Sequence, residues 1–293
     1  RADVERIFAE QLQRCQVEYF DFYLCHGVND NCIGTFMDPE IGVIPFLEEQ
    51  QRLGKIKYLG FSSHCGPENL EKFARLRKWD FAQIQLNYFD WEYQNAKKQY
   101  EILESLDIPV MVMEPCRGGR LSDLDEASNA IIKNAAPGRS ISSWAFRWLQ
   151  PLHNLQVILS GMSNLDQLKE NLSIFSSPDP LTEKELEALE AAKKSFSSKF
   201  TVPCTACRYC SECPQELNIP DILSAYNDVS ISDNDFQRGG TVRTLLRGGE
   251  KNDPSRCIGC GVCKNHCPQD IDTPSIMKEL SEIIEKIPEE FKK

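Results

Sequence analysis

Residues 18–27, EYFDFYLCHG, form an aromatic and apolar run that ends in a histidine and a glycine. A short run that is apolar on both faces predicts a buried strand. Four later segments share this character: GKIKYLGFSS (54–63), DFAQIQLNYFD (80–90), IPVMVMEPC (108–116) and LQVILSG (155–161). Helical spacing of apolar residues is found in 3–15, 41–53, 67–79, 94–106, 123–135, 140–149, 163–175 and 182–196. Strand and helix are therefore expected to alternate along the chain.

This alternation predicts a parallel sheet covered by helices, with right-handed connections between the strands. An open doubly wound sheet and a closed (β/α)8 barrel both satisfy the pattern. No G-x-G-x-x-G motif follows any of the strands, which disfavours the doubly wound dinucleotide-binding fold. Polar residues follow one strand after another instead: His26, Ser62, Ser63, Asn87, Glu114, Ser160 and Ser163. A TIM-type barrel gathers such residues on one rim, and we predict this α/β barrel for residues 1–196.

The remaining residues, 197–293, contain two regularly spaced cysteine runs. They are Cys204, Cys207, Cys210 and Cys213, followed by Pro214, and Cys257, Cys260, Cys263 and Cys267, followed by Pro268. Three thiols at C-x-x-C-x-x-C spacing can face three corners of one cubane cluster, and a more distant thiolate supplies the fourth. A zinc site would need only two C-x-x-C pairs, and disulfides are the third alternative. We predict two [4Fe–4S] clusters, held by these eight cysteines in a small, mostly α-helical, ferredoxin-like domain.

The bulk composition restricts the class of protein and its partners. The chain has 293 residues, of which 41% are hydrophobic and 26% charged, as expected for a globular protein of more than one domain. Its net charge of −11 argues against nucleic acid as the main partner. No apolar run approaches the ~20 residues of a membrane span. The other five cysteines are scattered through apolar segments, which fits a reducing cytoplasm.

The order of these motifs resembles the aldo-keto reductase family. EYFDFYLCHG is similar to the strand that ends in the active-site histidine of that family, and GKIKYLGFSS to the strand that contacts the nicotinamide carboxamide. FAQIQLNY resembles the next strand, and GMSNLDQLKENL resembles the segment that binds the adenosine phosphate and adenine. Together with the cysteine runs, this resemblance points to the ferredoxin-fused branch of the family.

The resemblance also implies that part of the barrel is not in this sequence. Family barrels have eight strands, and five are recognised here. The first three strands carry the catalytic tyrosine, aspartate and lysine of the family, so none of these can be assigned. We therefore expect the chain to be a portion of a barrel that residues upstream of Arg1, or another chain, would complete.

The resemblance assigns roles to residues at the strand ends. His26 matches the histidine that hydrogen-bonds a substrate carbonyl as negative charge develops on its oxygen. A rim histidine that bonds a backbone carbonyl is the alternative. Ser62, Ser63 and Gln83 match the carboxamide contacts, and ordinary strand-end packing is the alternative for them. Met113 falls near the position where many members stack an aromatic ring on the nicotinamide.

The adenosine side is matched by one later segment. Its residues are Gly161, Ser163, Gln167, Glu170 and Asn171. Free N–H groups at a helix start favour phosphate, although a plain capped helix would show the same pattern. Family members that select the 2′-phosphate of NADP usually have Lys and Arg where this chain has Gly161 and Gln167. The sequence therefore leaves the choice between NAD and NADP as the cofactor open. Arg117 would reach a phosphate or face solvent.

The resemblance to two-cluster ferredoxins implies that the last cysteine of each run crosses to the other cluster. One cluster would then use Cys204, Cys207, Cys210 and Cys267, and the other Cys257, Cys260, Cys263 and Cys213. The segments IPDILSAYN and VRTLLRGG between the runs are expected to be helical.

These observations leave two main hypotheses about function. The first is a nicotinamide-dependent oxidoreductase that acts on a small carbonyl or alcohol and exchanges electrons with a redox partner protein through the clusters. Hydride carries two electrons and a cluster carries one, so a flavin is an open question in this hypothesis. The second is a non-catalytic barrel that serves in electron transfer or redox sensing. A zinc-stabilised scaffold is the third and least favoured alternative.

Overall fold

The computed structural model describes residues 2–30, 32–197, 202, 204, 208, 210–232, 234–267 and 271–292. The chain divides into two compact units. Unit 1 comprises Arg1–Asp123 and Gly138–Lys184, and unit 2 comprises Leu124–Pro137 and Glu185–Lys293. No helix of the described residues is both long enough and apolar enough to cross a membrane.

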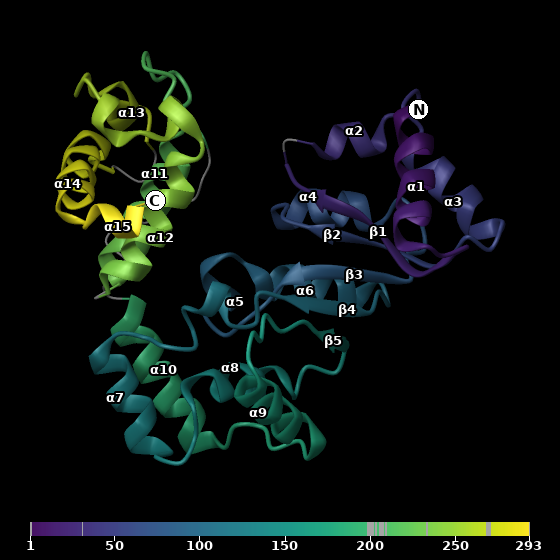
Figure 1. Cartoon of the computed structure of the whole chain (residues 1–293), viewed down its shortest axis with the longest axis horizontal. Helices are drawn as coiled ribbons and strands as arrows, with labels where there is room; N and C mark the ends of the chain where they lie inside the picture. Colours follow the sequence, from purple (N-terminus) through teal and green to yellow (C-terminus); the bar gives the residue numbers. More distant parts are fainter. Residues whose placement is uncertain are drawn as a thin grey trace. The chain divides into compact units, whose positions relative to one another are not determined.

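Unit 1 is built on a parallel sheet of five strands. They are β1 (Phe20–Val28), β2 (Ile56–Ser63), β3 (Phe81–Gln85), β4 (Val110–Met113) and β5 (Leu155–Ile158). Each strand pairs in parallel with the next one along the chain, in the order β1-β2-β3-β4-β5 (Figure 1). A doubly wound sheet reverses its strand order at a switch point, and this sheet does not. The order is that of a barrel wall, as predicted.

Helices connect the strands of this sheet. They are α1 (Ala2–Cys15), α2 (Ile33–Met37), α3 (Val43–Arg52), α4 (Pro67–Ala74), α5 (Asp90–Tyr93), α6 (Ala96–Ser105), the 3-10 turn η1 (Arg117–Gly119), α8 (Ile141–Leu149) and α9 (Leu165–Ser176). The predicted strand 80–90 ends early, at Gln85, because the side chain of Asn87 accepts the backbone N–H groups of Phe89 and Asp90 and turns the chain into α5. The helices α2 and α5 were not predicted, since each is too short to show an apolar period.

The core of unit 1 lies between the sheet and these helices. Phe61 on β2 packs edge-on against Phe73 of α4 and Trp79, with ring centroids 5.1 and 5.0 Å away. All three side chains are buried. Gly60 beside them permits a close approach of β3, because a Cβ atom there would lie 2.6 Å from the carbonyl oxygen of Phe81. Burial of large aromatic side chains is the main stabilising term here.

Unit 2 is helical. It contains α7 (Glu126–Ala135), α10 (Glu183–Ser197), α11 (Ile219–Ile231), α12 (Asp235–Leu246), α13 (Val262–Asn265), α14 (Thr273–Lys286) and α15 (Glu289–Lys292), with 3-10 turns η2 (Gly249–Asn252) and η3 (Pro254–Arg256). Helices α11, α12, α14 and α15 pack around one another (Figure 1). Their apolar core is continued by cysteines of both runs. The expected helix IPDILSAYN lies within α11. The expected helix VRTLLRGG is helical only as far as Leu246, where α12 ends, and α12 begins earlier than predicted.

Candidate functional site

The carboxyl ends of the parallel strands of unit 1 lie along one edge of the sheet, and we call the residues at and just after these ends the rim. His26 is exposed at the rim on β1. The register between β1 and β2 shifts between Cys25 and Val28, and Gly27 adopts a φ of 71°. The N–H of Gly27 donates to Ser62 Oγ at 2.8 Å. His26 thus lies within this irregularity, and bulges of this kind can redirect side chains.

The predicted carboxamide contacts lie close to this bulge. Ser62 and Ser63 are 1% and 2% exposed. Ser62 Oγ accepts the N–H of Gly27, as described above. Ser63 Oγ accepts the backbone N–H of Cys65 at 3.1 Å. Gln83 is half-buried, and its Nε2 lies 3.5 Å from Met113 Sδ. The Ser62 oxygen therefore stabilises the irregular end of β1, and the Ser63 oxygen stabilises the turn after β2.

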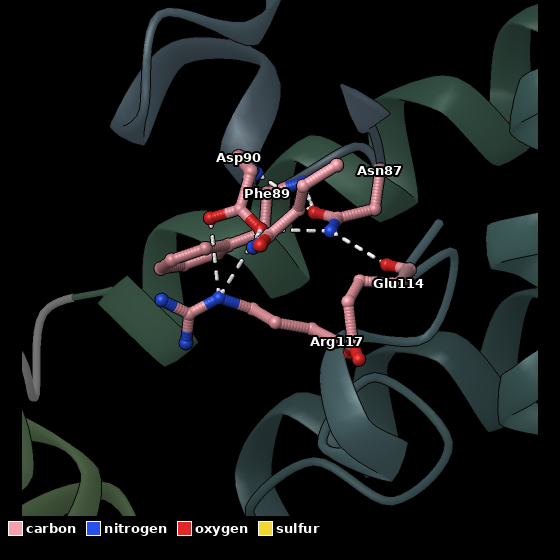
Figure 2. Close-up of polar contacts among 6 residues, drawn as sticks. Asn87, Phe89, Asp90, Glu114 and Arg117 are labelled. Carbon is pink, nitrogen blue, oxygen red and sulfur yellow. Dashed lines mark hydrogen bonds and ion pairs between the residues drawn. The ribbon is translucent and has the colours of Figure 1, made fainter. Parts of the chain in front are cut away.

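A polar network joins the turns that follow β3 and β4 (Figure 2). Asn87 Nδ2 donates to Asp90 Oδ2 at 2.8 Å and to the backbone oxygen of Glu114 at 3.0 Å. Asn87 and Asp90 are both 0% exposed. One buried amide thus connects two turns that are far apart in sequence, and this connection fixes their relative position at the rim.

Arg117 completes this network. Its Nε donates to Asp90 Oδ1 at 3.1 Å, and its guanidinium lies 5.1 Å from the ring centroid of Phe89 (Figure 2). The guanidinium also lies 5.5 Å from the ring centroid of Tyr93. The side chains of Arg117 and Asp90 are 13% and 0% exposed. Gln85 Nε2 also donates to Asp90, at 2.7 Å. The sequence suggested that Arg117 would contact a phosphate or face solvent. Neither alternative included this buried ion pair.

The turn after β4 has an uncommon backbone. Glu114 and Arg117 adopt φ values of 56° and 48°, in the left-handed region. Each such non-glycine residue costs roughly 1–2 kcal/mol. Hydrogen bonds from Arg117 N–H and Asn87 to the Glu114 oxygen hold the turn. Backbone strain of this kind is concentrated at functional sites, so the turn is a candidate part of the active site, with the exposed Glu114 carboxylate at the rim.

The predicted adenosine-side residues follow β5. Gly161 and Ser163 are exposed, and the N–H of Ser163 donates to Gln167 Oε1 at 2.7 Å. Asn164, and not Ser163, caps α9, because its Oδ1 accepts the N–H groups of residues 166 and 167. Asn171 Nδ2 donates to Ser160 Oγ at 2.9 Å, at the end of the strand. The capped helix therefore uses two of its own N–H groups internally.

Cys116 follows β4 and has two acidic residues in its surroundings. Glu170 is half-buried on α9. Burial is the main cause that raises the pKa of the Cys116 thiol, and the nearby carboxylates of Glu114 and Glu170 raise it further. Glu114 and Glu170 thus add to the cost of ionising this thiol.

Two cavities in unit 2 are lined by cysteines. The first is a small cavity of about 10 Å³, lined by Cys213, Cys257, Cys260 and Cys263 together with apolar side chains. The second has about 20 Å³, and its lining includes Cys204, Cys210, Cys263 and Cys267. Each cavity thus collects cysteines from both runs. Predicted residues Cys207 and Pro268 lie outside the described residues.

The lining of each cavity brings together several potential thiolate ligands. The thiols border a shared space, enclosed by apolar residues such as Ile219 and Met277. Within the described ranges, no three His, Cys, Asp or Glu side chains converge to hold a single metal ion. The donors are soft thiols, which suit iron–sulfur clusters.

Comparison with protein families identifies both regions of the chain. The profile of the aldo/keto reductase family matches residues 1–194. This chain belongs to the aldo/keto reductase family. The profile of a 4Fe-4S dicluster domain matches residues 203–271, so a family reductase domain is followed by an iron–sulfur domain. A comparison with curated proteins finds no match.

Solved aldo-keto reductases share the fold. Aldo-keto reductase AKR11C1 from Bacillus halodurans, in its apo form, is 21% identical, with 65% of this chain and 68% of that chain covered and a TM-score of 0.53. The thermostable reductase Tm1743, in complex with the inhibitor epalrestat, is 22% identical, with 66% of each chain covered and a TM-score of 0.52. An aldo/keto reductase from Klebsiella pneumoniae, in complex with NADP and acetate, is 21% identical, with 65% of each chain covered and a TM-score of 0.50. These likenesses confirm the predicted barrel-type α/β fold.

Sequence reasoning missed Asp90 and Thr273. Asp90 falls within the residues predicted to continue a strand, and the spacing of Asn87 and Asp90 in LNYFD is the signal that would have indicated a capped turn. Thr273 lies outside both cysteine runs, and no local pattern marks it as a cavity residue.

Proposed function

We propose that this aldo/keto reductase catalyses nicotinamide-dependent oxidation or reduction of a small carbonyl or alcohol, coupled to electron transfer through two [4Fe–4S] clusters and a redox partner protein. The pair of cavities lined by cysteines of both runs is the observation that carries the proposal. We place the boundary between a barrel domain, 1–196, and a cluster domain, 197–293, although the compact units also assign 124–137 and 185–196 to unit 2. The cytoplasmic location stays a prediction.

The resemblance to two-cluster ferredoxins suggests the cluster ligands, and the two linings contain seven of the eight cysteines. We propose Cys257, Cys260, Cys263 and Cys213 for one cluster and Cys204, Cys207, Cys210 and Cys267 for the other. When bound, the clusters would supply one-electron transfer. The apolar lining of the cavities excludes water and lowers the local dielectric, which is one means by which proteins set cluster potentials.

His26 is the proposed catalytic residue of this chain. Its ring would donate a hydrogen bond to the substrate oxygen, where negative charge develops during hydride transfer from a bound nicotinamide. The bulge at Gly27, held by Ser62, orients the ring for this role. Ser63 and Gln83 would donate to the carboxamide.

For the nucleotide, we infer a preference for NAD over NADP. Gly161 and Gln167 offer no cation to a 2′-phosphate, and the acidic residue Glu170 lies within the same segment. The capping of α9 by Asn164 also uses N–H groups that would otherwise face a phosphate. The proposed adenosine contacts are then Gly161, Ser163, Gln167, Glu170 and Asn171.

Titration of the full chain, loaded with iron and sulfide, with NADH and with NADPH tests this proposal. We expect saturable quenching or enhancement of nicotinamide fluorescence, with a lower Kd for NADH. Replacement of His26 by alanine should lower turnover about 10²–10³-fold, as loss of an oxyanion donor does, and leave the Kd for NADH unchanged. His153→Ala, at an exposed position between α8 and β5, is the matched control.

A second function is favoured by the serine contacts. Because Ser62 and Ser63 already accept backbone N–H groups, they are less available to a nicotinamide. If neither nucleotide binds while the clusters load and reduce normally, the chain is better described as an electron-transfer or redox-sensing protein on a reductase fold. If the protein takes up zinc but no iron and sulfide, both functions are refuted.

A further inference from the structure

An open cleft of unit 2 lies next to the cysteine-lined cavities. It has a volume of about 740 Å³, and its lining residues all belong to unit 2. Arg208, Cys210 and Pro220 line both this cleft and the cavity that contains Cys204 and Cys267. Sites for small organic ligands have volumes of about 300–1,000 Å³. The cleft therefore has room for a small molecule beside a proposed cluster.

The backbone around the cleft is held in an uncommon conformation. Arg208 and Glu216 both line the cleft and adopt φ values of 63° and 52°. Asn218, which caps α11, connects them to the opposite side of the cleft: its N–H donates to the backbone oxygen of Lys251 at 2.7 Å, and its Oδ1 accepts from Arg208 Nη1 at 3.3 Å. Left-handed backbone at non-glycine residues is concentrated at functional sites.

The charged side chains of the cleft leave one cation for a ligand. Lys251 Nζ pairs with Glu216 Oε2 at 3.0 Å, and Asp221 Oδ2 accepts from Asn218 Nδ2 at 2.5 Å. Among the residues that the structure describes, Arg208 forms no ion pair, and its Nη1 donates to the neutral amide of Asn218. A guanidinium can bind a phosphate through two parallel hydrogen bonds. Arg208 is therefore placed to hold an anionic group where the cleft meets the cavity.

Apolar residues separate the cleft from both cavities. Leu217 is buried and lines the cleft as well as the cavity that contains Cys257. Pro220 is also buried and lines the cleft as well as the cavity that contains Cys204. A ring packed on these two residues would be separated from each proposed cluster by the thickness of one side chain.

We propose that this cleft binds a phosphorylated flavin, flavin mononucleotide (FMN), with its phosphate on Arg208 and its ring against Leu217 and Pro220. A hydride carries two electrons and a cluster carries one, and a flavin can exchange electrons in either number. In the exchange, two reduced clusters each lose one electron, and the oxidised flavin gains both electrons together with two protons from solvent. The electron exchange, but not the flavin binding, rests on the clusters proposed above.

Titration of the full chain, loaded with iron and sulfide, with FMN and with riboflavin tests the binding by flavin fluorescence. Riboflavin has the same ring and no phosphate. We expect a Kd for FMN about tenfold lower than that for riboflavin, since a hydrogen bond between charged groups contributes on this order. Arg208→Gln should make the two Kd values equal, and Arg208→Lys, which keeps the charge, should retain part of the difference.

Arg238→Gln is the matched control, because Arg238 pairs with Asp235 on α12 and does not line the cleft. The ratio of the two Kd values should stay unchanged in this variant. Equal Kd values in the unmodified protein, an unchanged ratio in Arg208→Gln, or the absence of saturable flavin binding would each overturn the proposed site.

The electron exchange is measured without oxygen, by mixing FMN with protein whose clusters were reduced by dithionite and then separated from the excess. The rate of flavin reduction should saturate with FMN concentration in the unmodified protein and rise linearly over the same range in Arg208→Gln. A linear rise in the unmodified protein would refute exchange within the cleft. Absence of iron and sulfide from the unmodified protein would instead refute the cluster binding, while the flavin titration still decides the cleft.

Discussion

Replacement of Arg117 by methionine is expected to destabilise unit 1 strongly. The variant keeps an unbranched side chain but removes the cation from the buried Asp90 carboxylate. It also removes the guanidinium from the faces of Phe89 and Tyr93. Gln85 and Asn87 would still donate to Asp90, so the carboxylate would lose its charge partner and keep two neutral donors.

The expected loss in free energy of unfolding is about 3–5 kcal/mol. Removal of one partner from a buried ion pair costs about this much, because the other charge is left buried without compensation. Because Asp90 is 0% exposed, this pair counts as a buried ion pair. Arg117 is 13% exposed, so we expect a cost towards the lower limit of this range. The two cation–π contacts contribute a further amount of roughly 0.5–1 kcal/mol.

Urea unfolding followed by tryptophan fluorescence measures this loss. The chain has four tryptophans, at positions 79, 91, 144 and 148, and all of them belong to unit 1. The signal therefore reports unit 1 separately from the helical unit. With an m value of about 2 kcal/mol/M, a loss of about 4 kcal/mol lowers the midpoint by about 2 M urea.

The exposed pair of Arg75 and Glu71 is the matched control. Their side chains are 58% and 42% exposed, so Arg75→Met should cost less than about 1 kcal/mol. The double variant Asp90→Asn/Arg117→Met should be less destabilised than the sum of the single variants, since the two residues interact directly. A midpoint for Arg117→Met equal to that of Arg75→Met would refute the buried ion pair as a determinant of stability.

Three further predictions concern the sheet and the rim. Gly60→Ala should destabilise unit 1 by about 1–3 kcal/mol, because its Cβ would lie 2.6 Å from the Phe81 oxygen. Ser62→Ala should cost about 1–3 kcal/mol, since the N–H of Gly27 would lose its acceptor, and turnover should fall with it. Burial raises the pKa of Cys65 to about 11. The folded protein therefore binds the thiol proton of Cys65 more tightly than the unfolded chain does. The resulting contribution to the free energy of unfolding is fully present below about pH 8.5 and is lost as the pH rises towards 11.

The same urea assay checks all three. Gly138→Ala is the control for the glycine, because a Cβ atom at Gly138 would meet nothing within 4 Å. The Ser62→Thr variant keeps the hydroxyl oxygen, so its urea midpoint should fall less than that of Ser62→Ala. Cys65→Ser, whose hydroxyl does not titrate, should flatten the decline in midpoint between pH 8.5 and 10.5. A decline of the same slope in that variant would show that other groups cause it.

Much of the fold was predictable because it depends on local pattern. The apolar runs that became β1 and β2 and the amphipathic segments that became α1, α6 and α9 were recognised close to their observed bounds. Strand ends were less predictable. Strand β3 stops just before Asn87, whose side chain accepts backbone N–H groups in place of a neighbouring strand. Strand β4 stops at Met113, before Glu114, whose backbone is left-handed. Side-chain capping of this type leaves the apolar pattern of the sequence unchanged, and that pattern is what predicts a strand.

The sequence by itself determined the family, the alternation of strands and helices, and the eight cysteines that are candidates for cluster binding. Those features rest on residue type and on spacings of two to four residues, which are visible in one dimension. Only the tertiary structure decided that Arg117 pairs with Asp90, that the register of β1 shifts next to His26, and that Ile219 and Thr273 line both cysteine cavities. These contacts join separate elements, and their geometry depends on how strands and helices pack as the core excludes water.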